Sequence, residues 1–428
     1  MIQGRVIDGE SGTPLSDVVV SNGRDCVRTG EDGRFELPMP AQPETNNGVP
    51  LQVFAFVSTP AGYRSEEPGG WYRAAEDGDD FEFRLLTDGA RAGDTFSFAQ
   101  ITDLHVGRYP GDWIADDIRT ICEAHGADSG NARIDCIAAT GDLTQNGLPE
   151  EYDEYLAACG ASSVPLIHVP GNHDWKQDKS GAIWTRYLGP LHFSLNWGPV
   201  HLVAYDSGHR YSTYTLPLDE WLAADLALVP EGRPVVMLIH HQFAEDFYGP
   251  IRAMTDPPPN IVMSISGHWH TSRVYDDGHT LHFNQPTTSV GGIDYNPRGY
   301  TVARIAGDGA VEVKRHLLGV ERRSVRIGLS AIEDAPPTDS DAGAPPVCLT
   351  EPWPQYGGGS DRRGYVSEGP APPYRRVWQS RMPGGLFFGS PVIGGERVFI
   401  PTITEENARG GSIACVGAAT GGDAWTGE

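Results

Sequence analysis

The chain of 428 residues is long enough for two or three domains, each with its own hydrophobic core. Its net charge of −25 argues against the basic surface that holds nucleic-acid phosphates, so no nucleic-acid partner is expected. No apolar run approaches the roughly 18 residues of a membrane span, and the six cysteines show no C-x-x-C spacing, which excludes a zinc ribbon or a disulfide scaffold.

Residues 1–92 predict an all-β domain. Short β-rich runs alternate there with clusters of Gly, Asp, Pro and Asn, the pattern of a small β-sandwich. Gly4, Pro14, the valines at 18–20 and the turn "TGEDGRFEL" at 29–37 resemble the transthyretin-like or carboxypeptidase-regulatory-like modules. We expect such a module to act as a spacer or binding platform.

Residues 93–328 predict a second domain, in which strands and helices alternate as in an α/β sheet. The predicted strands are 95–102, 133–140, 164–169, 233–240 and the extended segment 261–270, followed by a hairpin at 300–315. The predicted helices are 113–124, 148–160 and 216–229, because their apolar residues recur at helical spacing.

The C-terminal part of the sequence predicts a linker and then a further all-β segment. Residues 329–348 are rich in Pro, Asp and Ala without periodicity, as in a linker. Residues 349–428 resemble the first blade of a pyrroloquinoline-quinone-type β-propeller, through "FFGSPVIGGERVFIPT" and "ACVGAATGGDAW". One blade cannot bury both its faces, so we expect a partial, truncated propeller. Both flanking modules resemble those of secreted enzymes, which favours a periplasmic or extracellular protein, although this chain carries no signal peptide.

Polar clusters of one kind follow each predicted strand of the α/β region. In chain order they are Asp103 and His105, Asp142, Asn172 with His173 and Asp174, His240 with His241, and His268 with His270. Taken singly, each cluster can be an ordinary turn. Because ligands of open α/β sheets bind at the carboxyl ends of the strands, the recurrence at five strand ends predicts one shared site.

The order D-x-H, GD, GNH[DE], H and GHxH resembles the signature of the calcineurin-like metallophosphoesterases, and it spans Asp103 to His270. The resemblance implies a multidomain protein around a four-layer α/β/β/α sandwich with two metal ions. It implies that Asp103, His105, Asp142 and His270 hold the first metal, and that Asp142, as a bridge, with Asn172, His240 and His268 holds the second. It also implies that His173 faces the phosphate.

The residue types support this chemistry by themselves. A bridging carboxylate such as Asp142 brings two divalent ions to roughly 4 Å, where they produce a bridging hydroxide that attacks phosphorus. His173 is then free to protonate the leaving alkoxide as a general acid. The mixture of imidazole and carboxylate favours manganese, iron or zinc as the two divalent ions over calcium or magnesium.

The sequence departs from the protein-phosphatase branch of that family. In that branch, the GD motif is followed three positions later by an Asp, which orients the histidine that corresponds to His173, and then by an Arg. In this chain the two positions are Gln145 and Asn146. This departure argues against a protein phosphatase, and it leaves Asp174 or a backbone carbonyl to polarise His173. His241 either supports the site or packs beside it, and Asp206 is a candidate supporting group.

The sequence therefore predicts a metal-dependent phosphoesterase for small-molecule or polymer phosphomonoesters or phosphodiesters. One alternative is a non-catalytic secreted protein that binds metal and takes part in glycan binding or adhesion. The complete ligand set argues against it, because a degenerate site would be expected to lose ligands. Another alternative is an oxidoreductase run by the propeller, which a single blade without quinone-binding residues supports little.

Overall fold

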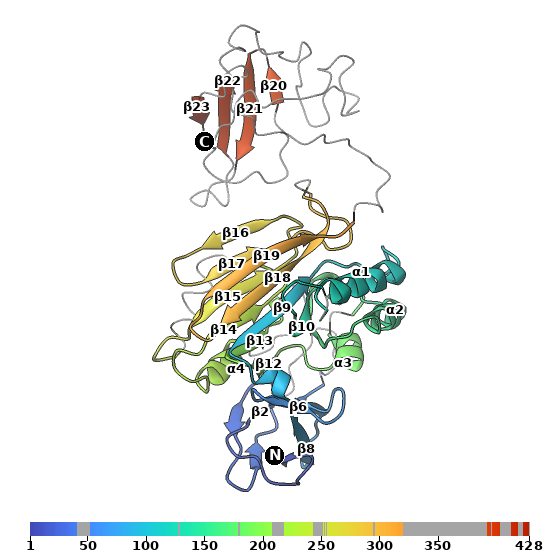
Figure 1. Ribbon diagram of the computed structural model, residues 1–428, viewed down its shortest axis with the longest axis vertical. Helices are drawn as coiled ribbons and strands as arrows, with labels where there is room; N and C mark the ends of the chain where they lie inside the picture. Colours follow the sequence, from blue (N-terminus) through green and yellow to red (C-terminus); the bar gives the residue numbers. More distant parts are fainter. Residues whose placement is uncertain are drawn as a thin grey trace. The chain divides into compact units, whose positions relative to one another are not determined.

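The computed structural model describes most of the first 319 residues and part of the C-terminal segment (Figure 1). The described ranges are 1–40, 52–126, 129–178, 180–207, 218–242, 251, 253, 255–293, 296–319, 392–394, 396–402, 412–417 and 423–427. The chain divides into two compact units, 1–322 and 323–428.

The first unit begins with two four-stranded sheets that share one apolar core. The first sheet has the order β4-β1-β8-β6, with β1 Ile2–Asp8, β4 Arg34–Leu37, β6 Tyr63–Ser65 and β8 Asp80–Thr87. The second has the order β3-β2-β5-β7, with β2 Val19–Ser21, β3 Cys26–Arg28, β5 Phe54–Ser58 and β7 Tyr72–Ala74. Ile2, Val6 and Phe83 of the first sheet pack with Val20 and Val57 of the second. The predicted all-β region is therefore observed, while its likeness to a particular sandwich family stays a prediction.

A five-stranded sheet carries the first half of the α/β region. Its order is β11-β10-β9-β18-β19, with β9 Thr95–Ile101, β10 Cys136–Thr140, β11 Leu166–Val169, β18 Gly299–Ala306 and β19 Val311–Leu317. The strands β9, β10 and β11 are parallel, so their carboxyl ends lie at the same edge. All five residues of β10 are buried, as expected for a parallel strand covered on both faces.

A six-stranded sheet carries the second half. Its order is β12-β13-β14-β15-β17-β16, with β12 Phe193–Trp197, β13 Val200–Ala204, β14 Val235–Leu238, β15 Ile261–Ser266, β16 Arg273–Asp276 and β17 Leu281–Asn284. One apolar cluster joins the two sheets, with Phe98 and Val169 from the first and Leu202, Val236 and Ile265 from the second. The sheets therefore pack face to face.

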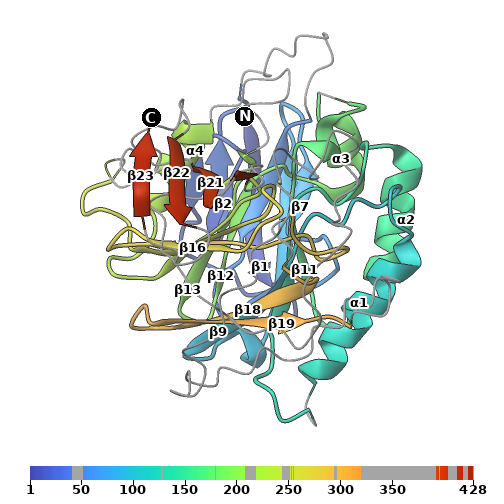
Figure 2. The ribbon, with the colours of Figure 1, turned by 90° about the horizontal axis from the view of Figure 1, so that it is seen from above.

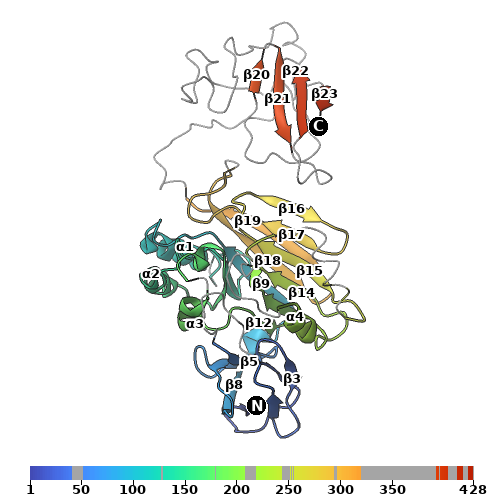
Figure 3. The same cartoon turned by 180° about the vertical axis from the view of Figure 1, so that it is seen from behind.

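Helices lie on the outer sides of these sheets. The helices α1 Gly111–Ala124, α2 Pro149–Cys159 and α3 Ala182–Leu188 lie on one side, and α4 Leu218–Leu226 lies on the other (Figures 1 and 3). Figure 2 shows α1 and α2 side by side, and their residues are in contact. Ile114, Ile118 and Ile121 of α1 are buried against Ile101 and Ile137 of the sheet. This order of layers agrees with the α/β/β/α arrangement expected from the sequence.

The N-terminal sheets and the α/β region meet through buried polar and aromatic contacts. The ring centroids of Trp71 and Phe193 are 4.5 Å apart. Ser194 Oγ donates to Asp225 Oδ1 at 2.6 Å and lies 2.9 Å from Ser58 Oγ, whose hydroxyl can donate to it. Since unpartnered buried polar groups are costly, these contacts favour one mutual arrangement.

In the second unit, the described residues form an antiparallel sheet of β20 Val392–Gly394, β21 Arg397–Thr402, β22 Ser412–Gly417 and β23 Asp423–Gly427. The predicted linker 329–348 and the start of the predicted blade lie outside the described residues. The assignment of the C-terminal sheet to a propeller blade stays a prediction. Across the described ranges of the chain, no helix is long and apolar enough to span a membrane.

Candidate metal centre

The structure brings the predicted side chains of all five strand ends into one place. Among the described residues, four overlapping sets have ligand atoms within 4.8 Å of one another: Asp103, His105 and His270; His105, Asp142 and His173; Asp103, Asp142 and His240; and His240, His241 and His268. Each set shares a member with another set. The six predicted ligands with imidazole or carboxylate side chains therefore form one connected cluster.

Asp142 stands at the centre of this cluster and is buried. Its Oδ1 atom lies 3.3 Å from His240 Nε2 and accepts a hydrogen bond of 2.8 Å from the backbone N–H of His173. Its Oδ2 atom lies 3.9 Å from His105 Nε2 and 4.0 Å from His173 Nε2. The two carboxylate oxygens thus face different imidazoles, which is the geometry a bridging ligand needs.

Asp103 connects the first and the last strand ends. Its Oδ1 atom lies 3.0 Å from His270 Nε2. The backbone N–H of His268 lies 3.1 Å from Oδ2, which also accepts a hydrogen bond from Thr102 Oγ1 at 2.9 Å. Asp103 therefore ties the loop after β15 to the end of β9.

The backbone is strained at these positions. The described part of the chain has few non-glycine residues with positive φ, namely Asp17 (64°), Asp103 (53°), His105 (50°), Asp142 (51°), His268 (66°) and His270 (51°). All of these except Asp17 are predicted ligands. Such conformations cost free energy and persist where the surrounding structure enforces them, typically at functional sites.

Two glycines of the motifs make room for the carboxylates. A Cβ atom on Gly171 would overlap the backbone nitrogen and Oδ1 of Asp142. A Cβ atom on Gly267 would overlap Asp103 Oδ2 and Thr102 Oγ1. The glycines of "GNHD" and "GHWH" are therefore required by close approach to the cluster.

Hydrogen bonds from behind the cluster orient its imidazoles. His240 Nδ1 lies 2.8 Å from the carbonyl oxygen of Thr140, which leaves Nε2 pointing at Asp142. Ser207 Oγ accepts from the backbone N–H of His240 at 3.1 Å and of His241 at 2.9 Å, and it lies 3.1 Å from His241 Nδ1. If the hydroxyl donates to that nitrogen, His241 Nε2 carries the proton and donates to Asn172 Oδ1, 3.1 Å away.

His241 thus contacts a predicted ligand rather than only packing nearby. Asp206, the other predicted supporting residue, is buried two positions after the end of β13. Sequence reasoning missed its neighbour Ser207, although Ser207 also follows the end of an apolar strand. It also missed Thr140, which acts through a backbone carbonyl that any residue could supply.

The inner surface of the cluster fits divalent metal ions. Both ring nitrogens of His105 and Nε2 of His240 are buried without a hydrogen-bond partner in the described structure. Unsatisfied buried nitrogens are costly, and coordination to a metal would satisfy them. Imidazole, carboxylate and amide groups together form a donor set suited to transition metals.

Burial and the mutual effects of carboxylates and imidazoles shift the pKa values of the cluster. Burial opposes the charge on Asp142, but the surrounding imidazoles, His240 first, hold the pKa of this carboxyl far below its usual range. Burial alone would lower the pKa of His240, but Asp142 outweighs it, helped by Asp103 and the Thr140 carbonyl, and raises that pKa to about 9. Burial lowers the pKa of His105 and of His268 to about 4. Two of the four predicted imidazole ligands are thus held neutral, as metal ligands must be. For His270, burial is outweighed by the hydrogen bond and charge of Asp103, which raise its pKa.

His173 faces the cluster from the exposed side. Its Nε2 atom is the one near Asp142, while Nδ1 lies 2.9 Å from the carbonyl oxygen of Gln145 and 2.7 Å from Lys176 Nζ. Asp174 instead accepts hydrogen bonds from the backbone of Gly171 at 2.8 Å and of Thr144 at 3.0 Å. Of the two candidates left open by the sequence, the backbone carbonyl is the one beside His173.

Asn172, which the sequence also predicts as a ligand, lies at the same edge through its contact with His241. The structure thereby gathers all seven predicted metal ligands and His173. It leaves none of them elsewhere in the fold.

Comparison with known proteins agrees with this arrangement. Residues 96–272 match the family described as calcineurin-like phosphoesterase, and residues 1–85 match the family described as the N terminal of calcineurin-like phosphoesterase. The glycerophosphodiester phosphodiesterase GpdQ of Enterobacter lignolyticus is 32% identical over 26% of this chain and 42% of its own length. The 3',5'-cyclic adenosine monophosphate phosphodiesterase CpdA of Escherichia coli is 22% identical over 44% of this chain and 76% of its own length.

The solved structure of PhoD is 11% identical, with a TM-score of 0.39, over 71% of this chain and 87% of that chain. The match to GpdQ covers about two fifths of that relative's length. The two matched families fall on the two described parts of the first unit. Residues 96–272 therefore form a calcineurin-like phosphoesterase domain, and residues 1–85 form the N-terminal domain that is its partner.

Proposed function

We propose that this chain is a phosphoric ester hydrolase that uses two divalent metal ions at the described cluster and acts on phosphodiesters. The observation that carries the proposal is the buried Asp142 carboxylate, which has imidazole nitrogens of His240, His105 and His173 within 3.3–4.0 Å. Few uses other than metal binding explain a buried carboxylate surrounded by three imidazoles.

Each predicted ligand would take the role that its motif position implies. Asp103, His105, Asp142 and His270 would hold one metal, and Asp142, Asn172, His240 and His268 would hold the other. When bound, such a pair supplies Lewis-acid polarisation of the phosphoryl oxygens and lowers the pKa of a water molecule that serves as nucleophile. The Thr140 carbonyl would keep Nε2 of His240 directed inward, since Nδ1 donates to it.

His173 would act on the leaving group. If Nδ1–H donates to the Gln145 carbonyl, Nδ1 cannot also accept from Lys176 Nζ, and Nε2 is then the nitrogen that exchanges a proton with the substrate. This imidazole is the most exposed of those around Asp142, which suits a group that must reach the substrate. It would protonate the leaving alkoxide as the ester bond breaks.

The preference for phosphodiesters rests on the relatives. GpdQ and CpdA are named as phosphodiesterases for a glycerophosphodiester and a cyclic nucleotide. We expect a small-molecule diester for this chain too. The proposal also includes the predicted domain limits: a first domain at 1–92, a phosphoesterase domain at 93–328, a linker at 329–348 and a partial propeller blade at 349–428. It includes the transthyretin-like or carboxypeptidase-regulatory-like character of the first domain.

Two chromogenic substrates test the proposal. The purified chain should hydrolyse bis(p-nitrophenyl) phosphate faster than p-nitrophenyl phosphate when Mn²⁺ or Zn²⁺ is added. EDTA should abolish the activity, and renewed metal should restore it. Inactivity on both esters, with two metal ions bound, would favour the non-catalytic binding protein instead.

A further inference from the structure

A cavity of about 700 Å³ lies between the N-terminal sheets and the α/β region. Its lining comes from β5, β6, β7 and the loop 66–71 on one side, and from α2, α3, β11 and β12 on the other. None of the predicted metal ligands lines it. Its size is that of a pocket for a small organic molecule, and junctions between domains are common places for such pockets.

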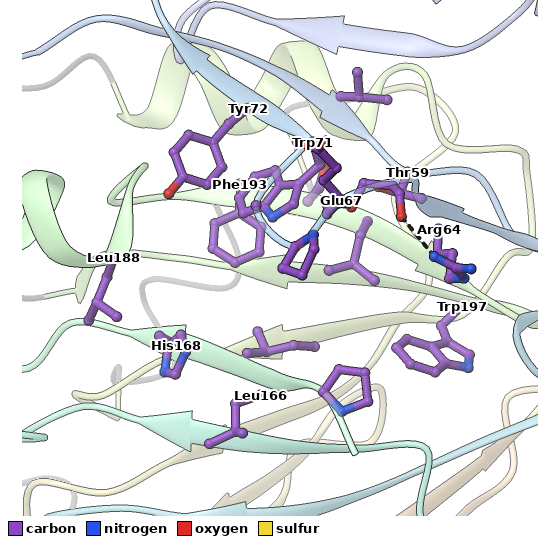
Figure 4. A pocket seen from close by; sticks show the side chains of 18 of the residues that line it. Thr59, Arg64, Glu67, Trp71, Tyr72, Leu166, His168, Leu188, Phe193 and Trp197 are labelled. Atoms are coloured by element: carbon purple, nitrogen blue, oxygen red, sulfur yellow. Dashed lines mark hydrogen bonds between the residues drawn. The ribbon is translucent and has the colours of Figure 1, made fainter. Parts of the chain in front are cut away.

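Apolar side chains form most of the cavity wall. Trp71 and Phe193 lie together along one wall, with Leu166 across from them, and Tyr72 and Leu188 close one end (Figure 4). The edge strands β11 and β12 of the two α/β sheets meet the N-terminal domain here. A ligand held by these walls needs an apolar ring or chain.

The other end of the cavity carries two guanidinium groups. Arg64 and Trp197 lie there (Figure 4), and the guanidinium carbon of Arg91 lies 3.9 Å from the centroid of the Trp197 ring. The side chain of Arg91 is only 15% exposed, and its Nε is buried without a hydrogen-bond partner in the described structure. Asp88 Oδ2 lies 3.5 Å from that nitrogen, which is close enough for an ion pair but longer than an ordinary hydrogen bond.

Acidic groups offset part of the positive charge of this end, Asp88 first among them. Burial lowers the pKa of Arg91; the charge of Asp88 opposes this shift, and the positive charge of Arg64 adds to it. The neighbouring acid Glu66 is already paired with Arg84 at 2.7 Å, and Glu67 lies exposed in the loop 66–71. Two nearby guanidinium groups, one of them with an unmade hydrogen bond, are suited to bind one carboxylate, sulfonate or phosphate group.

We infer that this cavity binds an amphipathic organic anion, with its apolar body between Trp71, Phe193 and Leu166 and its acidic group at Arg64 and Arg91. The arrangement matches such a ligand at both ends, because the walls remove the apolar body from water and the guanidinium groups receive the charge. The site is separate from the metal centre and does not depend on the proposed hydrolase activity.

Calorimetric titration of the full chain in EDTA tests the site, since EDTA removes metals that could themselves bind anions. The probes are naphthalene-2-sulfonate and octanoate, with naphthalene-2-sulfonamide as the uncharged counterpart. We expect both anions to bind and the sulfonamide to bind at least about tenfold more weakly. Preference for the first anion would indicate a ring as the apolar body, and preference for the second a chain.

Two variants assign the binding to this cavity. Arg64→Ala and Arg91→Met should each raise the dissociation constant of the anions about tenfold. Arg34→Ala, an exposed arginine of the same domain that does not line the cavity, should leave the dissociation constant unchanged. Equal binding of the sulfonamide, absence of binding, or wild-type affinity in both cavity variants would each overturn the inference.

Discussion

Nε2 of His240 lies 3.3 Å from Oδ1 of Asp142, although the two residues follow strands of different sheets. The contact joins the end of β10 in the five-stranded sheet to the end of β14 in the six-stranded sheet. The candidate metal centre therefore spans the packing of one sheet on the other. Its geometry depends on the core between the sheets as well as on the loops.

Removal of the central carboxylate tests the bridging role. In Asp142→Ala, we expect loss of both metals and a fall in diesterase activity of more than about a hundredfold, because even outer partners of metal ligands cost 10–100-fold. Metal content per chain, measured by plasma mass spectrometry, checks the first expectation. Asp116→Ala, at an exposed carboxylate of α1, is the matched control. Wild-type metal content in Asp142→Ala would disprove the bridging role.

Replacement of His173 should separate chemistry from metal binding. In His173→Ala, metal content should stay near that of the wild type, while turnover of an alkyl phosphodiester falls about 10²–10⁴-fold for want of a general acid. The loss should be much smaller for bis(p-nitrophenyl) phosphate, since p-nitrophenolate leaves without a proton. An equal loss on both esters would indicate that His173 does not protonate the leaving group.

The sequence allowed the strands and the ligand cluster to be predicted because both depend on local pattern. The apolar runs before Asp103 and Asp142 became β9 and β10, and the predicted ligands that follow them lie together. The order of strands in each sheet could not be predicted, because it is set by packing between distant segments. The roles of the Gln145 and Thr140 carbonyl groups could not be predicted either, because every residue carries a backbone carbonyl.

The close approach of Gly171 to Asp142 predicts a sensitive position. In Gly171→Ala, the added Cβ atom would overlap the backbone and side chain of Asp142, so the loop or the carboxylate must move. We expect at least about a tenfold loss of activity and weaker metal retention, because the groups that position the Asp142 carboxylate would be displaced. Gly89→Ala is the control, because a Cβ atom there meets no neighbour within 4 Å. Equal activity in the two variants would show that the loop adjusts without effect on the site.

His168 predicts a specific dependence of stability on pH. Burial lowers its pKa in the folded chain to about 4, from an ordinary value of 6.5, and its Nδ1 lies 2.9 Å from the hydroxyl of Tyr155. Between these two pKa values the unfolded chain binds the extra proton, so the folded state loses stability as the pH falls from about 6.5 towards 4. His168→Gln retains a partner for Tyr155 but cannot be protonated. Urea unfolding at pH 7 and at pH 4.5 should therefore show a loss about 2 kcal/mol smaller in the variant than in the wild type. The same loss in both proteins would mean that His168 is protonated in the folded chain at pH 4.5.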